Sequence, residues 1–259
     1  MNIETFSEAL TKVYIDNPCR IQATALWKTL EQIGNFHSNF TIEKDEVKSL
    51  KLWNKRMLHT FWNTNKNYID EQDLGQFNMI LVHQSQFNDN IKEQFPNKKS
   101  YFKLLHNNKD IIDINIPENY YIREVDINTE IQMVSDLICN CYDDIKPNVD
   151  EVLKWTKHPV FHNNLWIWII EKKIEKPVAL GIAELDMNIK EGALEWIQVL
   201  PSYHGNKLGK VLVIELLKRL EPYADFTIVS GEVDNITNPE RLYRSCGFVG
   251  DDTWHIMRR

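Results

Sequence analysis

The chain has 259 residues, of which 43% are hydrophobic and 26% are charged, and its formal net charge is −7. This composition is ordinary for a soluble globular protein, and the length fits one large domain or two small ones. The negative charge argues against a nucleic-acid partner, whose phosphates favour a basic surface. The first residues are polar and acidic, and no apolar run approaches the roughly 18 residues of a membrane helix. We therefore expect a cytoplasmic protein with no membrane partner.

The four cysteines are too few for a disulfide scaffold in a chain of this size. The close pair Cys139 and Cys141 would need further Cys or His ligands at suitable spacing to form a zinc site, and the neighbouring sequence offers none. We expect no metal, and we interpret the cysteines as core or surface thiols.

The N-terminal part of the chain is rich in Asn, Lys, Gln and aromatic residues and has weak periodicity. Its patterns predict helices at Phe6–Ile15, Ala23–Ile33 and Asp45–Trp62, a loop at Asn63–Asn67 and a strand at Phe77–His83. The third helix is expected because apolar residues recur there at three- and four-residue spacings. We expect a smaller, mainly helical region over residues 1–118, ending near Ile116-Pro117-Glu118.

From Asn119 onward the patterns are clearer, and residues 119–259 are expected to form a second domain. The predicted strands are Tyr120–Val125, Leu165–Ile170, Pro177–Asp186, Ala193–Leu200, Phe226–Val233 and Phe248–Arg259. The predicted helices are Asn128–Asp143, Asn148–Lys157, Leu208–Leu220 and Asn238–Cys246, with asparagine caps at 148 and 238. Leucines recur every four residues through the third of these helices, which predicts one buried face.

The segment PSYHGNKLGK, residues 201–210, joins a predicted strand to this helix. Backbone N–H groups at a helix start, together with the positive end of the helix dipole, bind anions such as phosphate. Lys207 and Lys210 add positive charge, although a basic helix start can also be an ordinary solvated face. A nucleotide P-loop is excluded because three residues, not four, separate Gly205 from Gly209, and Val211 stands where Ser or Thr would bind magnesium.

The order of these elements, β-α-α-β-β-β-α-β-α-β, and this motif resemble the Gcn5-related N-acetyltransferase (GNAT) family. In that family a Val-x-Pro-like corner precedes Arg/Gln-x-x-Gly-x-Gly/Ala, whose backbone binds the pyrophosphate of coenzyme A. Here Val199-Leu200-Pro201 forms the corner, but His204 replaces Arg/Gln and Lys207 replaces the first Gly. If the position of Lys207 requires a positive φ, lysine is a poor residue there.

A second block supports the resemblance. Family members often have Leu-Tyr followed by Gly-Phe after the fifth strand, and Leu242-Tyr243 and Gly247-Phe248 have this spacing. The upstream asparagine of the family pattern is offset, because Asn235 lies one residue further from the tyrosine than usual. Two further stretches, Leu194–Val199 and Asp251–Ile256, are similar to a branch of uncharacterised bacterial members.

The resemblance implies an α/β (α+β) GNAT fold with a mixed, mostly antiparallel sheet, and transfer of an acetyl group from acetyl-CoA to a primary amine. The residues that it implies for coenzyme A binding are Val199, His204, Gly205, Asn206, Lys207, Leu208, Gly209, Lys210, Asn235 and Asn238. Tyr243 stands at the position of the general acid, although it could also be an aromatic anchor. The oxygen of the tetrahedral intermediate would be stabilised by a backbone N–H near Val199.

A carboxylate must take the proton of the attacking amine, directly or through water. Glu195 lies two residues past the strand position of the family's glutamate and would share its face, because side chains two apart on a strand point the same way. It could equally be a carboxylate on a polar strand face. Glu184 and Glu232 are the other candidates.

Several alternatives stay open from the sequence. The chain could be a non-catalytic acyl-CoA-binding or interaction module, a reading motivated by His204 and Lys207. Residues 1–118 could be a degenerate second acyltransferase-like half, a lid, or the contact of a homodimer. The acceptor could be a small polyamine, amino sugar, amino acid or peptide N-terminus. The tryptophans at 166, 168, 196 and 254 could form an aromatic cage, but core packing is the better interpretation.

Overall fold

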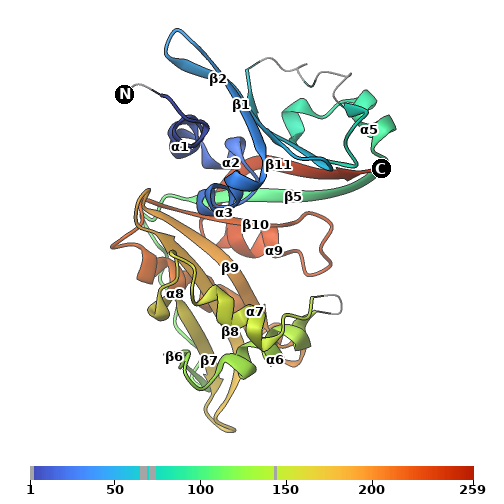
Figure 1. Ribbon diagram of the computed structural model, residues 1–259. Coiled ribbons are helices and arrows are strands. Elements are labelled where there is room, and N and C mark those ends of the chain that lie inside the picture. Colours follow the sequence, from blue (N-terminus) through green and yellow to red (C-terminus); the bar gives the residue numbers. More distant parts are fainter. Residues whose placement is uncertain (1–2, 65–68, 70–73, 143–144) are drawn as a thin grey trace. The chain divides into compact units, whose positions relative to one another are not determined.

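The computed structural model describes residues 3–64, 69, 74–142 and 145–259. The chain divides into two compact units (Figure 1). The first contains Met1–Leu105, Ser230–Glu240 and Gly250–Arg259, and the second contains His106–Val229 and Arg241–Val249. Of the helices in the described ranges, none has both the length and the apolar character that a bilayer crossing needs.

The first unit is built mainly on strands. They are β1 (His37–Glu43), β2 (Glu46–Trp53), β3 (Met57–Asn63), β4 (Met79–His83), β5 (Asn97–His106) and β11 (Val249–Arg258), in the order β1-β2-β3-β4-β11-β5. The helices are α1 (Phe6–Asp16), α2 (Pro18–Ile21), α3 (Leu26–Gln32) and α5 (Asp89–Gln94). The C-terminal strand β11 pairs antiparallel with β4, so the compact units do not coincide with a division of the chain near residue 118.

The expectation of a mainly helical N-terminal region is wrong, and so is the helix predicted over Asp45–Trp62. That stretch forms β2 and β3, which pair antiparallel. In β2 the burial of side chains alternates from residue to residue, as in a strand: Leu50 and Leu52 are buried, and Lys51 between them is more exposed. The pattern was ambiguous because Leu50, Trp53 and Met57 also fit helical spacing when the two strands are taken as one segment.

The turns before and after β2 show why this stretch forms separate strands and not one helix. Lys44 and Asp45 both have positive φ, 51° and 64°, as the two central residues of a type I′ hairpin turn do. Between β2 and β3, the Asn54 side chain accepts hydrogen bonds from the backbone N–H groups of Arg56 and Met57, at 2.9 and 3.0 Å. An asparagine that bonds to its own following backbone in this way closes a turn and interrupts a helix.

Other parts of the first unit agree better with the sequence. The helix predicted at Phe6–Ile15 is α1, and Thr5 and Glu8 form a capping box at its start. The helix predicted at Ala23–Ile33 is shortened to α3, and the strand predicted at Phe77–His83 is β4. Strands β1 and β5 and helix α5 were not predicted. Most of the loop predicted at Asn63–Asn67 lies outside the described residues.

A buried lysine holds the start of the chain to β5. Lys103 is fully buried, and its Nζ donates to the hydroxyl of Tyr14 at 3.1 Å. The same Nζ lies within 3.0 Å of three backbone carbonyl oxygens, those of Pro18, Gln22 and Thr24. Lysine is rarely buried completely unless its ammonium is hydrogen-bonded, and here oxygen atoms surround it. These bonds replace the water that the ammonium loses.

The second unit has the element order that the sequence predicted. Its strands are β6 (Tyr120–Glu124), β7 (Trp166–Glu171), β8 (Lys176–Asp186), β9 (Glu191–Val199) and β10 (Phe226–Glu232), of which the last continues into the first unit. Its helices are α6 (Ile131–Cys141), α7 (Val149–Trp155), α8 (Leu208–Leu220) and α9 (Pro239–Ser245, the first two residues being in the first unit). Asn148 caps α7 as expected, with Glu151 completing a capping box. Asp143, the predicted end of α6, lies outside the described residues.

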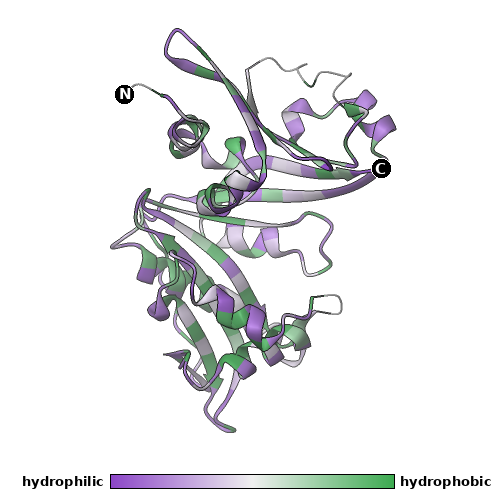
Figure 2. Cartoon of the chain, viewed as in Figure 1, coloured by the Kyte–Doolittle hydropathy of each residue, from purple (hydrophilic) through white to green (hydrophobic). Residues whose placement is uncertain are grey.

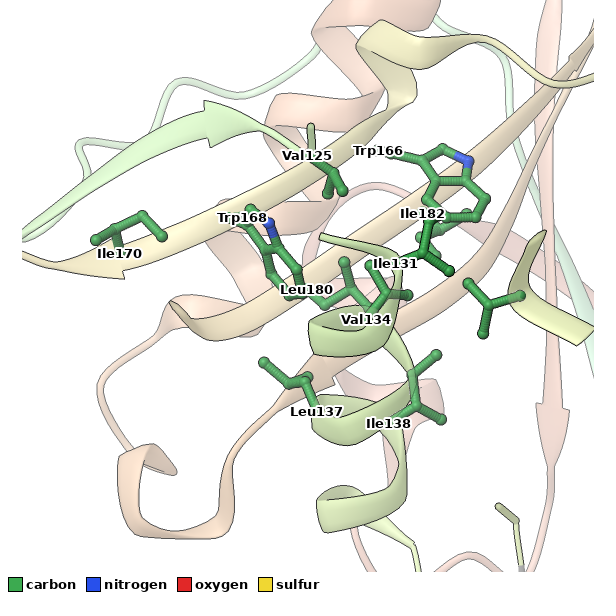
Figure 3. Close-up of a cluster of buried hydrophobic side chains, with 11 residues drawn as sticks. Val125, Ile131, Val134, Leu137, Ile138, Trp166, Trp168, Ile170, Leu180 and Ile182 are labelled. Carbon is green, nitrogen blue, oxygen red and sulfur yellow. The ribbon is translucent and has the colours of Figure 1, made fainter. Parts of the chain in front are cut away.

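Helices cover both faces of the sheet in this unit. On one face, Ile131, Val134 and other residues of α6 pack against the buried side chains of β7 and β8, including Trp166 and Trp168 (Figure 3). These two tryptophans are 2% and 0% exposed, so both belong to the core rather than to a ligand cage. Helix α8 packs on β8 and β9, and hydrophobic residues recur along these strands in Figure 2. Its leucines at 208, 212, 216 and 220 are buried, as predicted.

We expect Lys103→Met to destabilise the protein strongly. The methionine would fill a similar volume but remove the ammonium from the Tyr14 hydroxyl and from the carbonyls of Pro18, Gln22 and Thr24, of which the Thr24 carbonyl still accepts from the Gln22 amide. Each buried group that loses its partner costs roughly 1–3 kcal/mol, so the free energy of unfolding should fall by at least about 3 kcal/mol. Denaturation in urea measures this loss. The exposed Lys92→Met is the control and should change stability by less than about 1 kcal/mol; an equal effect of the two substitutions would contradict a structural role for Lys103.

Candidate functional site

A β-bulge in β9 organises the candidate site. In the antiparallel pairing of β8 with β9, Ala183 pairs with Leu194 but Ile182 pairs with Trp196. Glu195 is therefore an extra residue of β9, and a bulge of this kind changes which face the following side chains occupy.

The two ends of β9 show this change of face. A Cβ on Gly192 would lie 2.9 Å from a Leu220 methyl carbon, so Gly192 faces α8. Trp196, four residues later, would face α8 too in a regular strand. It packs instead against the core cluster that contains residues of α6 and α7. The bulge thus turns Trp196 and Gln198 toward the α6 side of the sheet.

The pairing of β9 with β10 ends at the same place. The two strands pair in parallel from Glu191 and Phe226 to Leu194 and Val229. On its other side β9 stays paired with β8 to its end, where the Leu200 N–H donates to the Val178 carbonyl at 3.0 Å. Because N–H groups alternate sides along a strand, the Val199 N–H points away from β8.

Tyr243 lies on α9 and is 8% exposed. Burial raises the pKa of this phenol above its ordinary value of 10, and the charges of Tyr142, Cys246 and Glu195 raise it further. The phenol therefore keeps its proton throughout the neutral pH range. Its ring also packs edge-on against Phe248, with centroids 5.8 Å apart, so Tyr243 is an aromatic anchor of α9 as well as a candidate acid.

Glu195 is among the groups that raise the pKa of Tyr243, after burial, Tyr142 and Cys246, so its carboxylate lies in the neighbourhood of the phenol. Both belong to the second unit. The other carboxylates considered from the sequence differ in their surroundings. Glu184 is on β8 and half-buried, whereas Glu232 is in the first unit, where its carboxylate lies 3.5 Å from the Lys99 ammonium.

The loop before α8 has the backbone of an anion-binding turn. Gly205 has φ +85°, and Lys207, which caps α8, has φ 62° and ψ 11°. The position of Lys207 therefore does require the left-handed conformation, which glycine adopts freely and lysine does not. Backbone conformations that alternate in hand direct successive N–H groups into one concave surface, which suits an anion.

Side chains of the loop make local contacts. His204 Nε2 donates to the Val199 carbonyl at 3.0 Å, and Asn206 Nδ2 donates to the Tyr203 carbonyl at 3.0 Å. His204 therefore binds the corner at the end of β9, from a loop that is exposed to solvent. Lys207 is exposed as well, so its ammonium is accessible to a ligand.

The first residues of α8 serve different purposes. Leu208 is buried, so it offers a ligand its backbone alone. A Cβ on Gly209 would lie 3.2 Å from a Leu242 methyl carbon, which explains glycine where α8 approaches α9. Lys210 is close enough to Cys246 to lower the pKa of that thiol, although burial outweighs this effect and the net shift is upward. Lys210 therefore lies in the neighbourhood of Cys246, which follows α9.

Asn235 and Asn238 belong to the first unit. The Asn235 side chain accepts from the backbone and hydroxyl of Thr237, at 2.9 and 2.7 Å, and forms a local turn. Asn238 precedes α9 with φ 46°. The turn gives Asn235 a structural explanation, and a role of either residue in binding coenzyme A stays a prediction.

Three further residues of the second unit, Tyr142, Gln198 and Trp155, do not stand out in the sequence. Tyr142 follows α6, Gln198 is on β9, and the Gln198 amide donates to the Tyr142 hydroxyl at 2.8 Å. Trp155, on α7, stacks on Trp196 with centroids 5.2 Å apart and rings 19° from parallel. The available signal was the bulge, which decides the direction of Trp196 and Gln198, and a bulge has no reliable sequence pattern when both strands are apolar.

The chain matches a known family model over part of its length. Residues 131–248 match the model of the Acetyltransferase (GNAT) family. No curated protein matches the chain in sequence. The matched segment contains the bulge, the loop before α8 and Tyr243.

Solved structures resemble the chain over nearly its whole length. A GCN5-related N-acetyltransferase from Sphaerobacter thermophilus has a TM-score of 0.70 at 10% identity, with 99% of this chain and 93% of that chain covered. A GNAT-family acetyltransferase from Colwellia psychrerythraea has a TM-score of 0.65 at 11% identity, covering 100% and 98%. A tandem GNAT protein from the clavulanic acid biosynthesis pathway has a TM-score of 0.55 at 9% identity, covering 96% and 94%. At these low identities the likeness shows the fold alone, and this is the GNAT fold that the sequence predicted.

Comparison of two substitutions at Lys207 tests the left-handed backbone. Lys207→Gly and Lys207→Ala both remove the ammonium, but only alanine keeps a Cβ at positive φ. We expect the glycine variant to have the higher free energy of unfolding, by about 1 kcal/mol. At Lys218, inside the same helix, the order should be reversed, because alanine is favoured over glycine there by about 1 kcal/mol. Denaturant unfolding of the four variants decides, and an alanine advantage at both positions would contradict the turn.

Proposed function

We propose, from the GNAT acetyltransferase domain that this chain carries at residues 131–248, that it transfers an acetyl group from acetyl-CoA to a primary amine. By its domain family the chain is an acyltransferase. The observation that carries the proposal is that Glu195, in the β9 bulge, lies in the neighbourhood of the protonated phenol of Tyr243, whose pKa it helps to raise. A base and an acid in one region of the molecule suit a reaction in which one proton is taken from the amine and another is given to the leaving thiolate.

The residues before α8 fit a pyrophosphate. Helix α8 has 13 residues, and its first turn, which the structure describes in full, has no acidic side chain. The backbone N–H groups from Gly205 to Gly209 would bind the phosphate oxygens, with the helix dipole adding to the attraction. Lys207 and Lys210 would add positive charge. When bound there, acetyl-CoA supplies the activated acetyl thioester.

Glu195 would prepare the acceptor for attack. An alkyl amine has a pKa near about 10.4 and is almost entirely protonated at neutral pH, so its nitrogen must lose a proton before it can attack the thioester carbon. A carboxylate at the bulge is placed to take this proton, directly or through water. The carbonyl oxygen would gain negative charge during the attack, and the Val199 N–H, which points away from β8, would donate to it.

Tyr243 would assist departure of the thiolate. Its raised pKa keeps the phenolic proton in place at neutral pH, so the phenol can donate a hydrogen bond to the sulfur and then transfer the proton. The thiols nearest the site are poor nucleophiles, because burial raises the pKa of Cys246 and raises that of Cys141 to about 11. This favours direct attack by the amine over an acetyl-cysteine intermediate.

The alternative is a module that binds acyl-CoA without turning it over. Two observations motivate it: His204 is bonded to the Val199 carbonyl, and Lys207 adopts an unfavourable backbone conformation. Neither disturbs Glu195 or Tyr243. A module without turnover has no requirement for a phenol beside a carboxylate, and for this reason we favour the enzyme.

Tyr243→Phe separates the two readings. It removes the hydroxyl and keeps the ring that packs against Phe248, so the fold and acetyl-CoA binding should be retained. We expect kcat to fall on the order of 100-fold, the usual range for loss of a general acid, with the Kd for acetyl-CoA changed less than about two-fold. Release of free thiol with an acetylated amine measures kcat, and calorimetry measures Kd. The exposed Tyr223→Phe is the matched control; an unchanged kcat in Tyr243→Phe would remove the phenol from the mechanism.

A further inference from the structure

An aromatic ladder, made of Tyr142, Trp196 and Trp155, borders the reactive pair in the second unit. Resting on the proposed function, we propose that this ladder is the wall against which the acceptor lies, and that the acceptor is a primary amine with an aromatic or similarly apolar body and no carboxylate. Tyr142 is then the residue that determines specificity, and Trp196 and Gln198 hold it in place.

The ladder has a defined geometry. Trp155 stacks on Trp196, with centroids 5.2 Å apart, and Tyr142 meets Trp196 nearly at right angles, at 6.2 Å and 77°. The Gln198 amide fixes the far end of Tyr142 through a hydrogen bond of 2.8 Å to its hydroxyl. An aromatic ring that is held on an edge and at its hydroxyl has little freedom, and such a ring makes a preformed contact surface.

The exposure of the ladder distinguishes it from the core. Trp166 and Trp168, in the same unit, are almost completely buried, with 2% and 0% of their surface exposed. The three ladder residues are each only partly buried, although they pack against that core. A rigid aromatic group that stays accessible beside a hydrophobic core offers apolar area to a ligand.

The ladder lies in the same region as the candidate reacting groups. After burial, Tyr142 is the first of the groups that raise the pKa of the Tyr243 phenol. Trp196 directly follows Glu195 at the bulge. An amine that approaches Glu195 from the α6 side of the sheet would therefore place its carbon body against these rings.

The charges of the surrounding elements select against a carboxylate. The sequences of α6 and β9 contain no Lys or Arg, whereas β9 contains Glu191 and Glu195. The Lys146 ammonium, at the end of α6, is bonded to the carbonyls of Cys139 and Tyr142. Lys154 of α7 is exposed and lies on the opposite side of the helix from buried Val152. A carboxylate against α6 and β9 would meet the acidic and aromatic groups of these two elements, whereas an ammonium would be attracted to both kinds of group. The basic residues Lys210, Arg241 and Arg244 belong to α8 and α9.

The test uses three amines that differ in one feature each. Phenethylamine has the aromatic body, phenylalanine adds a carboxylate to it, and ethylamine lacks the ring. We expect kcat/KM for phenethylamine to exceed that for either of the others by at least about ten-fold, as burial of an apolar group against a fitted wall gives. Equal kcat/KM for phenethylamine and phenylalanine would overturn the proposal.

Substitutions at Tyr142 test whether the ladder causes the preference for phenethylamine. Tyr142→Ala should raise KM for phenethylamine at least about ten-fold while leaving that for ethylamine within about two-fold, because only the larger amine reaches the ring. Tyr142→Phe keeps the ring but loses the bond from Gln198, so it should retain most of the preference. Tyr223→Ala, at an exposed tyrosine of the same unit, should change neither value. A preference that survives Tyr142→Ala would contradict the assignment.

A binding measurement separates failure of this proposal from failure of the proposed function. Fluorescence of the tryptophans reports an amine that lies against Trp196 and Trp155, without requiring turnover. Tighter binding of phenethylamine than of phenylalanine, with no acetylation of either, would support the wall and refute the enzyme. Acetylation of both amines, with no difference between them in binding or in kcat/KM, would support the enzyme and refute the wall.

Discussion

The β-bulge at Glu195 is the constraint on which the candidate site depends. One extra residue in β9 has three consequences at a single point of the sheet. It places a carboxylate where no regular pairing to β8 exists, it turns Trp196 and Gln198 toward α6, and it coincides with the end of the parallel pairing to β10. The strand is thereby divided into a first half that packs on α8 and a second half whose side chains and backbone are available to the chemistry. Tyr243 completes the arrangement from α9.

The start of α8 imposes a second constraint, and it conflicts with the sequence there. Eight residues of α8 are buried, which fixes the axis of the helix, and Gly209 permits its approach to Leu242 of α9. The chain must then leave the corner after β9 and enter this helix through a left-handed residue. Lys207 occupies that position against its own preference, which is possible because the surrounding packing determines the backbone. The strain lies in the loop that would bind the phosphates.

The sequence predicted the second unit well and the first unit poorly, for physical reasons. Leucines at every fourth position predict the buried face of helix α8, and Asn148 caps α7 as the sequence predicts. In contrast, β2 and β3 carry apolar residues that also fit a helix, and Asn54 between them was the decisive but overlooked signal. Tyr243 and the loop before α8 follow sequence patterns that resemble those of the GNAT family. Tyr142, Trp155 and Gln198 do not, because their place in the site depends on a bulge and on contacts between distant segments.

The most direct test of the account is thermal or chemical unfolding of the purified protein with and without acetyl-CoA. A ligand at about 100 times its Kd stabilises the folded state by roughly 2.7 kcal/mol, a shift that is easily measured. We expect a clear rise of the midpoint with acetyl-CoA, because the backbone N–H groups at the start of α8 would bind phosphate whatever side chain stands at 204 or 207. An unchanged midpoint at millimolar acetyl-CoA would contradict it, and would mean that Lys207 and His204 have closed this loop to the acyl donor.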